Sequence, residues 1–244
     1  MTLHFERIDF AVQIATAEAA IRALVFDFDG LIVDTETAEH QAWQELYYER
    51  GAELPLERWI ECIGTSMDAW NPYDQLEQQL GELIDRQQIR VRVAERTAEI
   101  LADRSTLPGV SEFMDRAREL DMPIGVASSS SRQWVESHLA RLALRERFDV
   151  IRCSDDVDQV KPDPELYLSV CQALDAEPEA SIAVEDSPNG IRAAKAAGLY
   201  CVSVPNALTR NLSMDSADLV LVSLATITLD EVIERAGPPS GRAS

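Results

Sequence analysis

The sequence contains few of the residues that build the commoner metal and disulfide sites. Histidine occurs only at His4, His40 and His138, too few and too scattered for a histidine-rich metal site. The four cysteines lie far apart and form no CxxC pair, so neither zinc binding nor a disulfide framework is supported. A chain without disulfides fits a reducing compartment, and we expect a cytoplasmic protein.

Long apolar runs and positive charge are also scarce. No apolar run approaches the ~20 residues that a membrane span requires. The formal net charge of −21 repels nucleic acid and anionic membranes, which excludes both as main partners. Residues 1–20 lack the basic start of a secretory signal, and we expect an N-terminal extension without chemistry. Because no heptad pattern is present, we expect a monomer.

The remaining sequence is typical of a globular α/β protein, with 46% hydrophobic residues in 244. An apolar strand is predicted over 21–28, and residues 35–105 then have helical periodicity interrupted by glycine and proline. After Pro108-Gly109 helices alternate with strands, which predicts a doubly wound, Rossmann-like parallel sheet. We therefore expect an α/β core from 21–34 and 106–240, and a helical unit from 35–105. The later strands are predicted at 123–127, 150–153, 181–185, 200–204 and 219–222.

The strongest chemical signal is Asp27-Phe28-Asp29-Gly30, at the end of the first predicted strand. Side chains two residues apart in an extended segment point to the same side, so both carboxylates can face one site. Two anions this close need a cation or a shared proton, and Mg²⁺ binds such oxygen ligands. A plain turn would explain Asp29-Gly30 but would not explain an acid at Asp27, within an apolar strand.

Three further polar elements follow other strands of the predicted sheet. They are Ser128 with Ser129, then Lys161, then Glu185-Asp186. Each alone has a structural explanation: a serine loop, a solvated lysine, or an acid that caps a helix. Lys161 is followed by Pro162-Asp163-Pro164, and we expect Asp163 to be the N-cap of the next helix. Because ligands bind at the carboxyl ends of parallel strands, the combination predicts one phosphoryl-transfer site.

These residues, in this order, resemble the haloacid dehalogenase superfamily over roughly residues 21–236. The insertion directly after the first strand is similar to the helical cap of the subgroup that contains β-phosphoglucomutase and many sugar-phosphate phosphatases. The resemblance implies that Asp27 is the nucleophile and Asp29 the general acid and base. It also implies that Ser128 and Lys161 contact the phosphoryl group. Mg²⁺ would be held by Asp27, Asp29, Glu185 and Asp186.

The resemblance also suggests which residues bind the substrate, a small phosphorylated metabolite such as a sugar phosphate. These are Gly30 and Ser129 in the core, and Glu39, Thr65 and Ser66 in the cap. Thr65 and Ser66 match the family's specificity loop by position. The cap is expected to open and close about Asp34 and residues 105–108.

Several related activities are alternatives to a phosphatase. Dehalogenation is disfavoured because Asp29 is present, and phosphonate hydrolysis because residues 35–105 contain no lysine. A hexose-phosphate mutase shares every core motif, but Glu39 stands where the mutase has its hinge histidine, Met67 replaces its phosphate-binding arginine, and its cap lysine is missing. A catalytically idle, protein-binding relative is the third hypothesis. The intact set of acids and Lys161 argues against it.

Overall fold

The computed structural model describes residues 21–60, 63 and 70–238. Its core is one sheet of six parallel strands in the order β3-β2-β1-β4-β5-β6. This confirms the predicted doubly wound α/β fold. The strands are β1 (Ala23–Phe26), β2 (Ile124–Ala127), β3 (Val150–Arg152), β4 (Ser181–Glu185), β5 (Tyr200–Ser203) and β6 (Leu219–Val220).

Helices cover both faces of the sheet because the strands are apolar on both sides. In β1, Leu24 and Phe26 join one buried cluster with α6, α7 and α10, whereas Val25 joins a second cluster with α8 and α9. This period of two follows from the pleat of a strand. The core helices are α6 (Val110–Glu119), α7 (Arg132–Arg141), α8 (Glu165–Ala173), α9 (Pro188–Ala197) and α10 (Leu229–Ala236).

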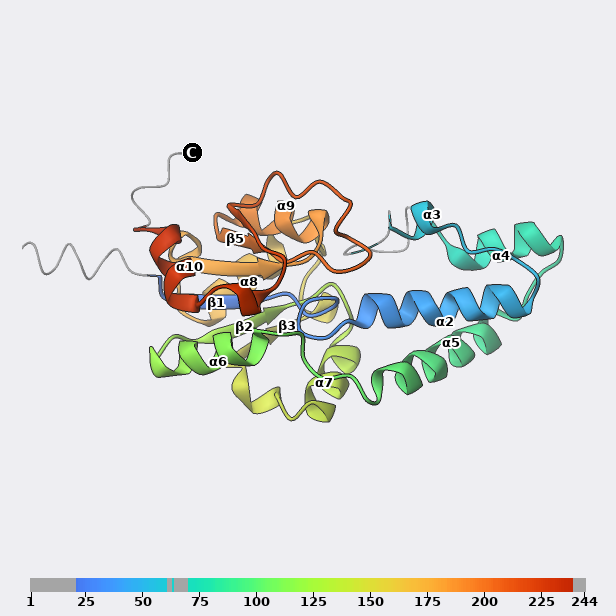
Figure 1. Ribbon diagram of the computed structural model, residues 1–244, viewed down its shortest axis with the longest axis horizontal. Coiled ribbons are helices and arrows are strands. Elements are labelled where there is room, and N and C mark those ends of the chain that lie inside the picture. The colour runs from blue at the N-terminus through green and yellow to red at the C-terminus, as the bar shows by residue number, and fades with distance from the viewer. Residues whose placement is uncertain (1–20, 61–62, 64–69, 239–244) are drawn as a thin grey trace, which may run out of the picture.

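Four helices between β1 and α6 form what we call the helical insertion. They are α2 (Thr35–Glu49), α3 (Leu56–Ile60), α4 (Pro72–Leu80) and α5 (Arg86–Leu101). Figure 1 shows α2 and α5 running side by side away from the sheet, with α3 and α4 on the other side of α2. Asp34, Asn71 and Asp85 cap the starts of α2, α4 and α5 by accepting a backbone hydrogen bond.

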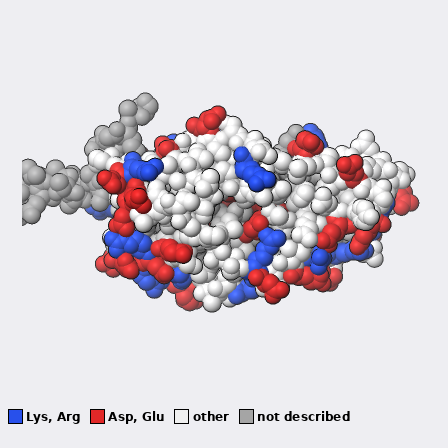
Figure 2. Space-filling model, in the orientation of Figure 1, with Lys and Arg blue, Asp and Glu red and all other residues white. Residues whose placement is uncertain are grey.

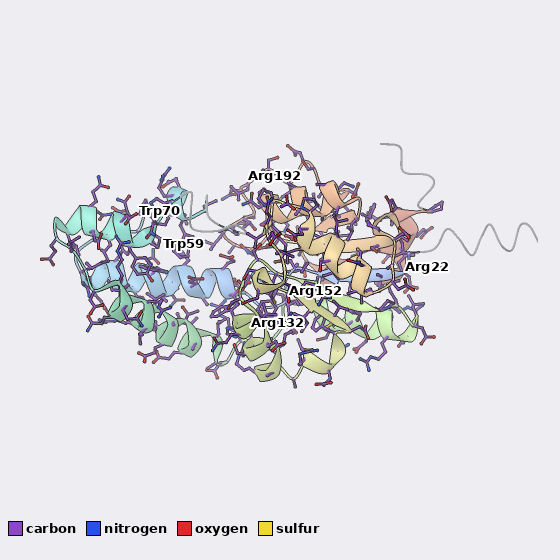
Figure 3. The ribbon with its side chains drawn as sticks, turned by 180° about the vertical axis from the view of Figure 1, so that it is seen from behind. Arg22, Trp59, Trp70, Arg132, Arg152 and Arg192 are labelled. Atoms are coloured by element: carbon purple, nitrogen blue, oxygen red, sulfur yellow. The ribbon has the colours of Figure 1, made fainter. Side chains whose placement is uncertain are left out.

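The helical insertion has a hydrophobic core of its own, built around tryptophan. Trp43, Trp59 and Trp70 are buried in it, and the rings of Trp59 and Trp70 lie 6.3 Å apart (Figure 3). Buried aromatic side chains of this size dominate the stability of a small core. Trp43, Trp59 and Trp70 therefore serve the core of the helical insertion.

Some predicted boundaries were wrong. The first strand is Ala23–Phe26 rather than 21–28, because the chain turns out of the sheet directly after Asp27. Asp163 is not the N-cap of α8, which begins at Glu165 after Pro164. The residues before α10 form a separate 3₁₀ turn, Leu224–Thr226, because Thr228 and Glu231 form a capping box that starts α10 at Leu229.

The strand order reverses between β1 and β4, which lie side by side at the centre of the sheet. In open α/β sheets the crevice beyond the carboxyl ends of such strands is where ligands bind. Asp27 follows β1 and Asp186 follows β4, so the fold brings two of the predicted site residues to this point. Within the described ranges, none of the helices combines the length and the apolarity needed to cross a membrane.

Candidate active site

Asp27 lies at the end of β1, where the backbone leaves the sheet. Its N–H still donates to the carbonyl of Val184 at 2.9 Å, which fixes the residue beside β4. The residue is only 6% exposed. Burial raises the pKa of Asp27 to about 8, aided by the charges of Glu185 and Asp29 and opposed by Lys161. Ionising Asp27 in this buried position therefore costs free energy, and a nearby cation can offset that cost.

Lys161 supplies that positive charge from the loop between β3 and α8. Its ammonium group donates to Asp27 Oδ1 and, at 2.7 Å, to Glu185 Oε1, and it lies 5.1 Å from the centre of the Tyr167 ring. The residue is 2% exposed. Burial alone would lower the pKa of Lys161, but the two carboxylates outweigh burial and raise it. Lys161 is thus charged when the carboxylates are ionised, and it connects the strand ends of β1 and β4.

Glu185, the last residue of β4, is fully buried and hydrogen-bonded through both oxygens. Oε1 also accepts from the Tyr167 hydroxyl at 2.6 Å, and Oε2 accepts from the N–H of Asp186 at 3.1 Å. Gly190 leaves room for this carboxylate, because a Cβ there would lie 1.9 Å from it. With its oxygens occupied in this way, Glu185 is well placed to orient Lys161.

Asp186 completes a group of three buried carboxylates. One oxygen from each of Asp27, Glu185 and Asp186 lies within 4.8 Å of the others. Burial, followed by the charges of Asp27 and Glu185, raises the pKa of Asp186 well above its usual range. Hard oxygen donors that repel one another, offset by a single lysine, fit a small divalent cation such as Mg²⁺.

Asp29 is held by four side-chain donors. Oδ1 accepts from the Thr35 hydroxyl at 2.9 Å and from the Trp134 indole at 2.8 Å. Oδ2 accepts from Ser130 at 2.7 Å and from Ser128 at 3.3 Å. The donors come from the starts of α2 and α7 and from the loop after β2. They fix the direction of a carboxylate that lies two residues after Asp27.

The loop after β2 contains the predicted serines. Ser128 is buried, and besides its bond to Asp29 its hydroxyl accepts from the N–H of Ser130 at 3.0 Å. The buried hydroxyl of Ser129 has no hydrogen-bond partner within the part of the chain that the structure describes. A buried, unpaired hydroxyl is costly and indicates a group available for a ligand.

Gly30 is required by the geometry of the turn after Asp29. Its φ of +76° is left-handed, and a Cβ would lie 2.3 Å from Asp186 Oδ2 and 2.6 Å from Asn206 Nδ2. Its N–H donates to Thr35 Oγ1 at 3.0 Å. Gly30 thus lets the loop after β1 approach the end of β4.

The helical insertion contributes acids at the start of α2. Glu39 is half-buried, and burial together with the charge of Asp29 raises its pKa to about 7. Burial, and then the charge of Asp29, raises the pKa of Glu36 well above its usual range. Glu39 thus lies near the carboxylates, whereas the predicted contacts at Thr65 and Ser66 fall outside the described residues.

Arginine contributes little positive charge to the group of carboxylates. Arg132 pairs with Asp156 at 2.6 Å, and Arg152 donates to Ser169 at 3.0 Å (Figure 3). On the face drawn in Figure 2, basic and acidic side chains are interspersed along the side formed by α5, α6 and α7. Lys161 pairs with two of the three buried carboxylates, Asp27 and Glu185.

Sequence reasoning missed several residues that the structure brings to the site. Thr35, Ser130 and Trp134 contact Asp29, and Asn206 donates to Asp186 at 2.6 Å. Asn206 follows a predicted strand, so the rule that selected Ser128 and Lys161 could have found it. Trp134 gave no such signal, because an aromatic residue on a helix is usually part of the core.

Comparison with known proteins gives a consistent result. Residues 24–204 match the family model described as "Haloacid dehalogenase-like hydrolase". The chain is 43% identical over 209 residues to "Putative phosphatase YhcW" of Bacillus subtilis, covering 86% of this chain and 94% of that protein. It is 30% identical over 207 residues to validoxylamine A 7'-phosphate phosphatase of Streptomyces hygroscopicus subsp. limoneus, covering 84% and 95%. The crystal structure of CbbY from Rhodobacter sphaeroides in complex with phosphate is similar, with a TM-score of 0.67, 30% identity and coverage of 84% and 95%.

Proposed function

Since the chain belongs to the haloacid dehalogenase-like hydrolases and is a phosphoric monoester hydrolase, we propose that it hydrolyses a small sugar phosphate in a magnesium-dependent reaction at Asp27. The observation that supports this most strongly is the position of Asp27. It is buried at the switch point, paired with Lys161 and within reach of Asp186. Glu185 shares these features, but both of its oxygens accept hydrogen bonds within the protein, from Lys161, Tyr167 and the N–H of Asp186.

In the first step we propose that a carboxylate oxygen of Asp27 attacks phosphorus. The bond between phosphorus and the ester oxygen breaks, and Asp29 gives its proton to the leaving alkoxide. The product is an aspartyl-phosphate on Asp27. Lys161 and Ser128 offset the negative charge on the oxygens of the transferring group.

In the second step Asp29 accepts a proton from water as the water oxygen attacks phosphorus. The bond between phosphorus and Asp27 breaks, which releases inorganic phosphate and restores the Asp27 carboxylate and the protonated Asp29. The four donors around Asp29 support this role, because they hold its carboxyl group in one orientation.

Asp27, the Asp29 backbone carbonyl and Asp186 would hold Mg²⁺, with Glu185 acting mainly through Lys161. The ion supplies positive charge that draws the phosphate oxygens to Asp27 and stabilises the transition state. The residues of the chain provide the orientation. Asp27 is fixed by its backbone bond to β4, and Lys161 by its two carboxylate partners.

The proposed substrate class rests on relatives and on the helical insertion. One relative is named validoxylamine A 7'-phosphate phosphatase, and another was crystallised with phosphate. We propose that residues 35–105 form a cap that excludes water, with Gly30, Ser129, Glu39, Thr65 and Ser66 lining the substrate. The Arg104–Asp34 ion pair, at 2.7 Å, links the two ends of this unit.

The experiment is phosphate release from a panel of sugar phosphates, with and without Mg²⁺. We expect release by the wild type, a loss of at least about a thousandfold in Asp27→Asn, and loss in EDTA. Release that persists in Asp27→Asn would overturn the proposed nucleophile. With β-glucose 1-phosphate, formation of glucose 6-phosphate faster than release would make the protein a mutase instead.

A further inference from the structure

We propose that Asn206 is a positioning residue that sets the orientation of Asp186 for the metal. The inference rests on the proposed magnesium-dependent function and concerns a residue outside the four family motifs. Asn206 Nδ2 donates to Asp186 Oδ2 at 2.6 Å. This bond occupies one carboxylate oxygen and leaves Oδ1 for a cation.

The Asn206 side chain is itself held by the loop that follows β5. Its Oδ1 accepts from the N–H of Leu208 at 2.8 Å and from that of Thr209 at 3.1 Å. The backbone N–H of Asn206 donates to the Thr209 hydroxyl at 3.0 Å, and Thr209 is fully buried. Because backbone donors fix the oxygen of the amide, its NH₂ group must face Asp186.

The sheet places this loop beside Asp186. Ser203, at the end of β5, is in register with Glu185, and the N–H of Val204 donates to the carbonyl of Glu185 at 2.6 Å. The loop after β1 approaches the hydrogen bond between Asn206 and Asp186 at Gly30. Only glycine fits there, since a Cβ would clash with both Asp186 and Asn206. Backbone groups of three strand ends therefore define where Asp186 points.

Such a contact matters because Asp186 is buried among other acids. Without a donor on Oδ2, its carboxylate can rotate away from Asp27 and Glu185, whose charges repel it. Groups that hydrogen-bond a metal ligand typically change metal affinity by about 10- to 100-fold when they are removed. Asn206 thus contributes to metal binding without contacting the metal.

The test uses two variants at Asn206 and a control in the same loop. Asn206→Ala removes the amide, whereas Asn206→Ser keeps a hydroxyl that can accept from the loop N–H groups but is too short to reach Asp186. Leu208→Ala keeps Asn206 and removes an apolar side chain that packs against the core of the helical insertion. Mg²⁺ binding to the substrate-free protein is measured by titration calorimetry, and kcat and KM by phosphate release at saturating Mg²⁺.

We expect both Asn206 variants to bind Mg²⁺ about tenfold more weakly or worse, while Leu208→Ala binds it as the wild type does. At saturating Mg²⁺ the Asn206 variants should lose kcat with little change in KM. Wild-type Mg²⁺ affinity in the Asn206 variants would overturn the inference, as would equal weakening in Leu208→Ala. Failure of the wild type to bind Mg²⁺ would instead overturn the proposed function.

Discussion

Lys161 shows how a single residue makes the site possible. It is one of two lysines, and its charge is shared between two buried carboxylates. Removing one partner of a buried ion pair usually costs more than the pair contributes, because the remaining charge is left without compensation. The other lysine, Lys195, pairs with Asp218 at 2.7 Å near the surface and provides a matched comparison.

We predict that Lys161→Ala lowers the free energy of unfolding by about 3 kcal/mol at pH 8 without Mg²⁺. Lys195→Ala should lower it by about 1 kcal/mol or less, because exposed ion pairs contribute little. The measurement is urea denaturation of both variants and the wild type. Equal losses would show that Lys161 does not offset the buried carboxylates.

The pKa of Asp27 predicts how stability depends on pH in the metal-free protein. Burial raises this pKa from 3.8 to about 8, so between these values the folded chain holds a proton that the unfolded chain has released. The protonated Asp27 therefore contributes to the free energy of unfolding at low pH, and this contribution is lost as pH rises towards about 8. In EDTA, the melting temperature of the wild type should therefore fall with pH more steeply than that of Asp27→Asn. Parallel curves would contradict the assigned pKa.

At the scale of elements, the loop after β1 decides whether the strand ends can meet. Gly30 and Gly51 both have left-handed backbones, with φ of +76° and +72°. A Cβ at Gly51 meets nothing within 4 Å, whereas at Gly30 it would meet Asp186 and Asn206. Comparing alanine at the two positions therefore separates backbone strain from disruption of the site.

We predict that Gly51→Ala loses about 1–2 kcal/mol of stability from the left-handed backbone, and that Gly30→Ala loses more because its Cβ also meets Asp186 and Asn206. Only Gly30→Ala should also lose Mg²⁺ affinity, by at least about tenfold. Thermal denaturation and titration calorimetry measure the two effects. Unchanged Mg²⁺ affinity in Gly30→Ala would contradict the described approach of the two loops.

The strands also explain which site residues could be predicted from the sequence. Asp27, Ser128, Lys161 and Asp186 were found because each follows a strand, and parallel strands end at one edge. Trp134 could not be found in this way, because its indole reaches Asp29 only through the orientation of α7. The periodicity of apolar residues also predicted the ends of strands and helices poorly. The first strand ends where the turn after Asp27 begins, and that turn depends on backbone hydrogen bonds that the apolar pattern does not encode.

At the scale of the whole molecule, the sheet and the helical insertion differ in what they contribute to the structure. The sheet brings together residues that are distant in sequence, such as Asp27 and Lys161, whereas the helical insertion has a tryptophan-rich core of its own. Figure 1 shows the two parts joined where α2 and α5 meet the core. The predicted limits of the cap, 35–105, remain a proposal; α2 begins at Thr35 and α5 ends at Leu101.

The net charge of −21 makes the local arrangement of charge more important than the total. Under the proposed function an anionic substrate approaches a molecule that repels it, so we propose that the attraction arises from Lys161 and from a cation held at the strand ends. Catalysis is therefore expected to depend on Asp27 and the groups around it rather than on the general charge of the surface.

The most direct test of this claim is to trap the phosphorylated enzyme. Asp29→Ala is incubated with acetyl phosphate and Mg²⁺, because a good leaving group needs no proton from Asp29, while the second step is slowed. After acid quenching, peptides are analysed by mass spectrometry. We predict one added phosphoryl group on the peptide that contains Asp27, absent when Asp27 is also changed to Asn. A phosphoryl group elsewhere, or its persistence in that double variant, would contradict Asp27 as the nucleophile.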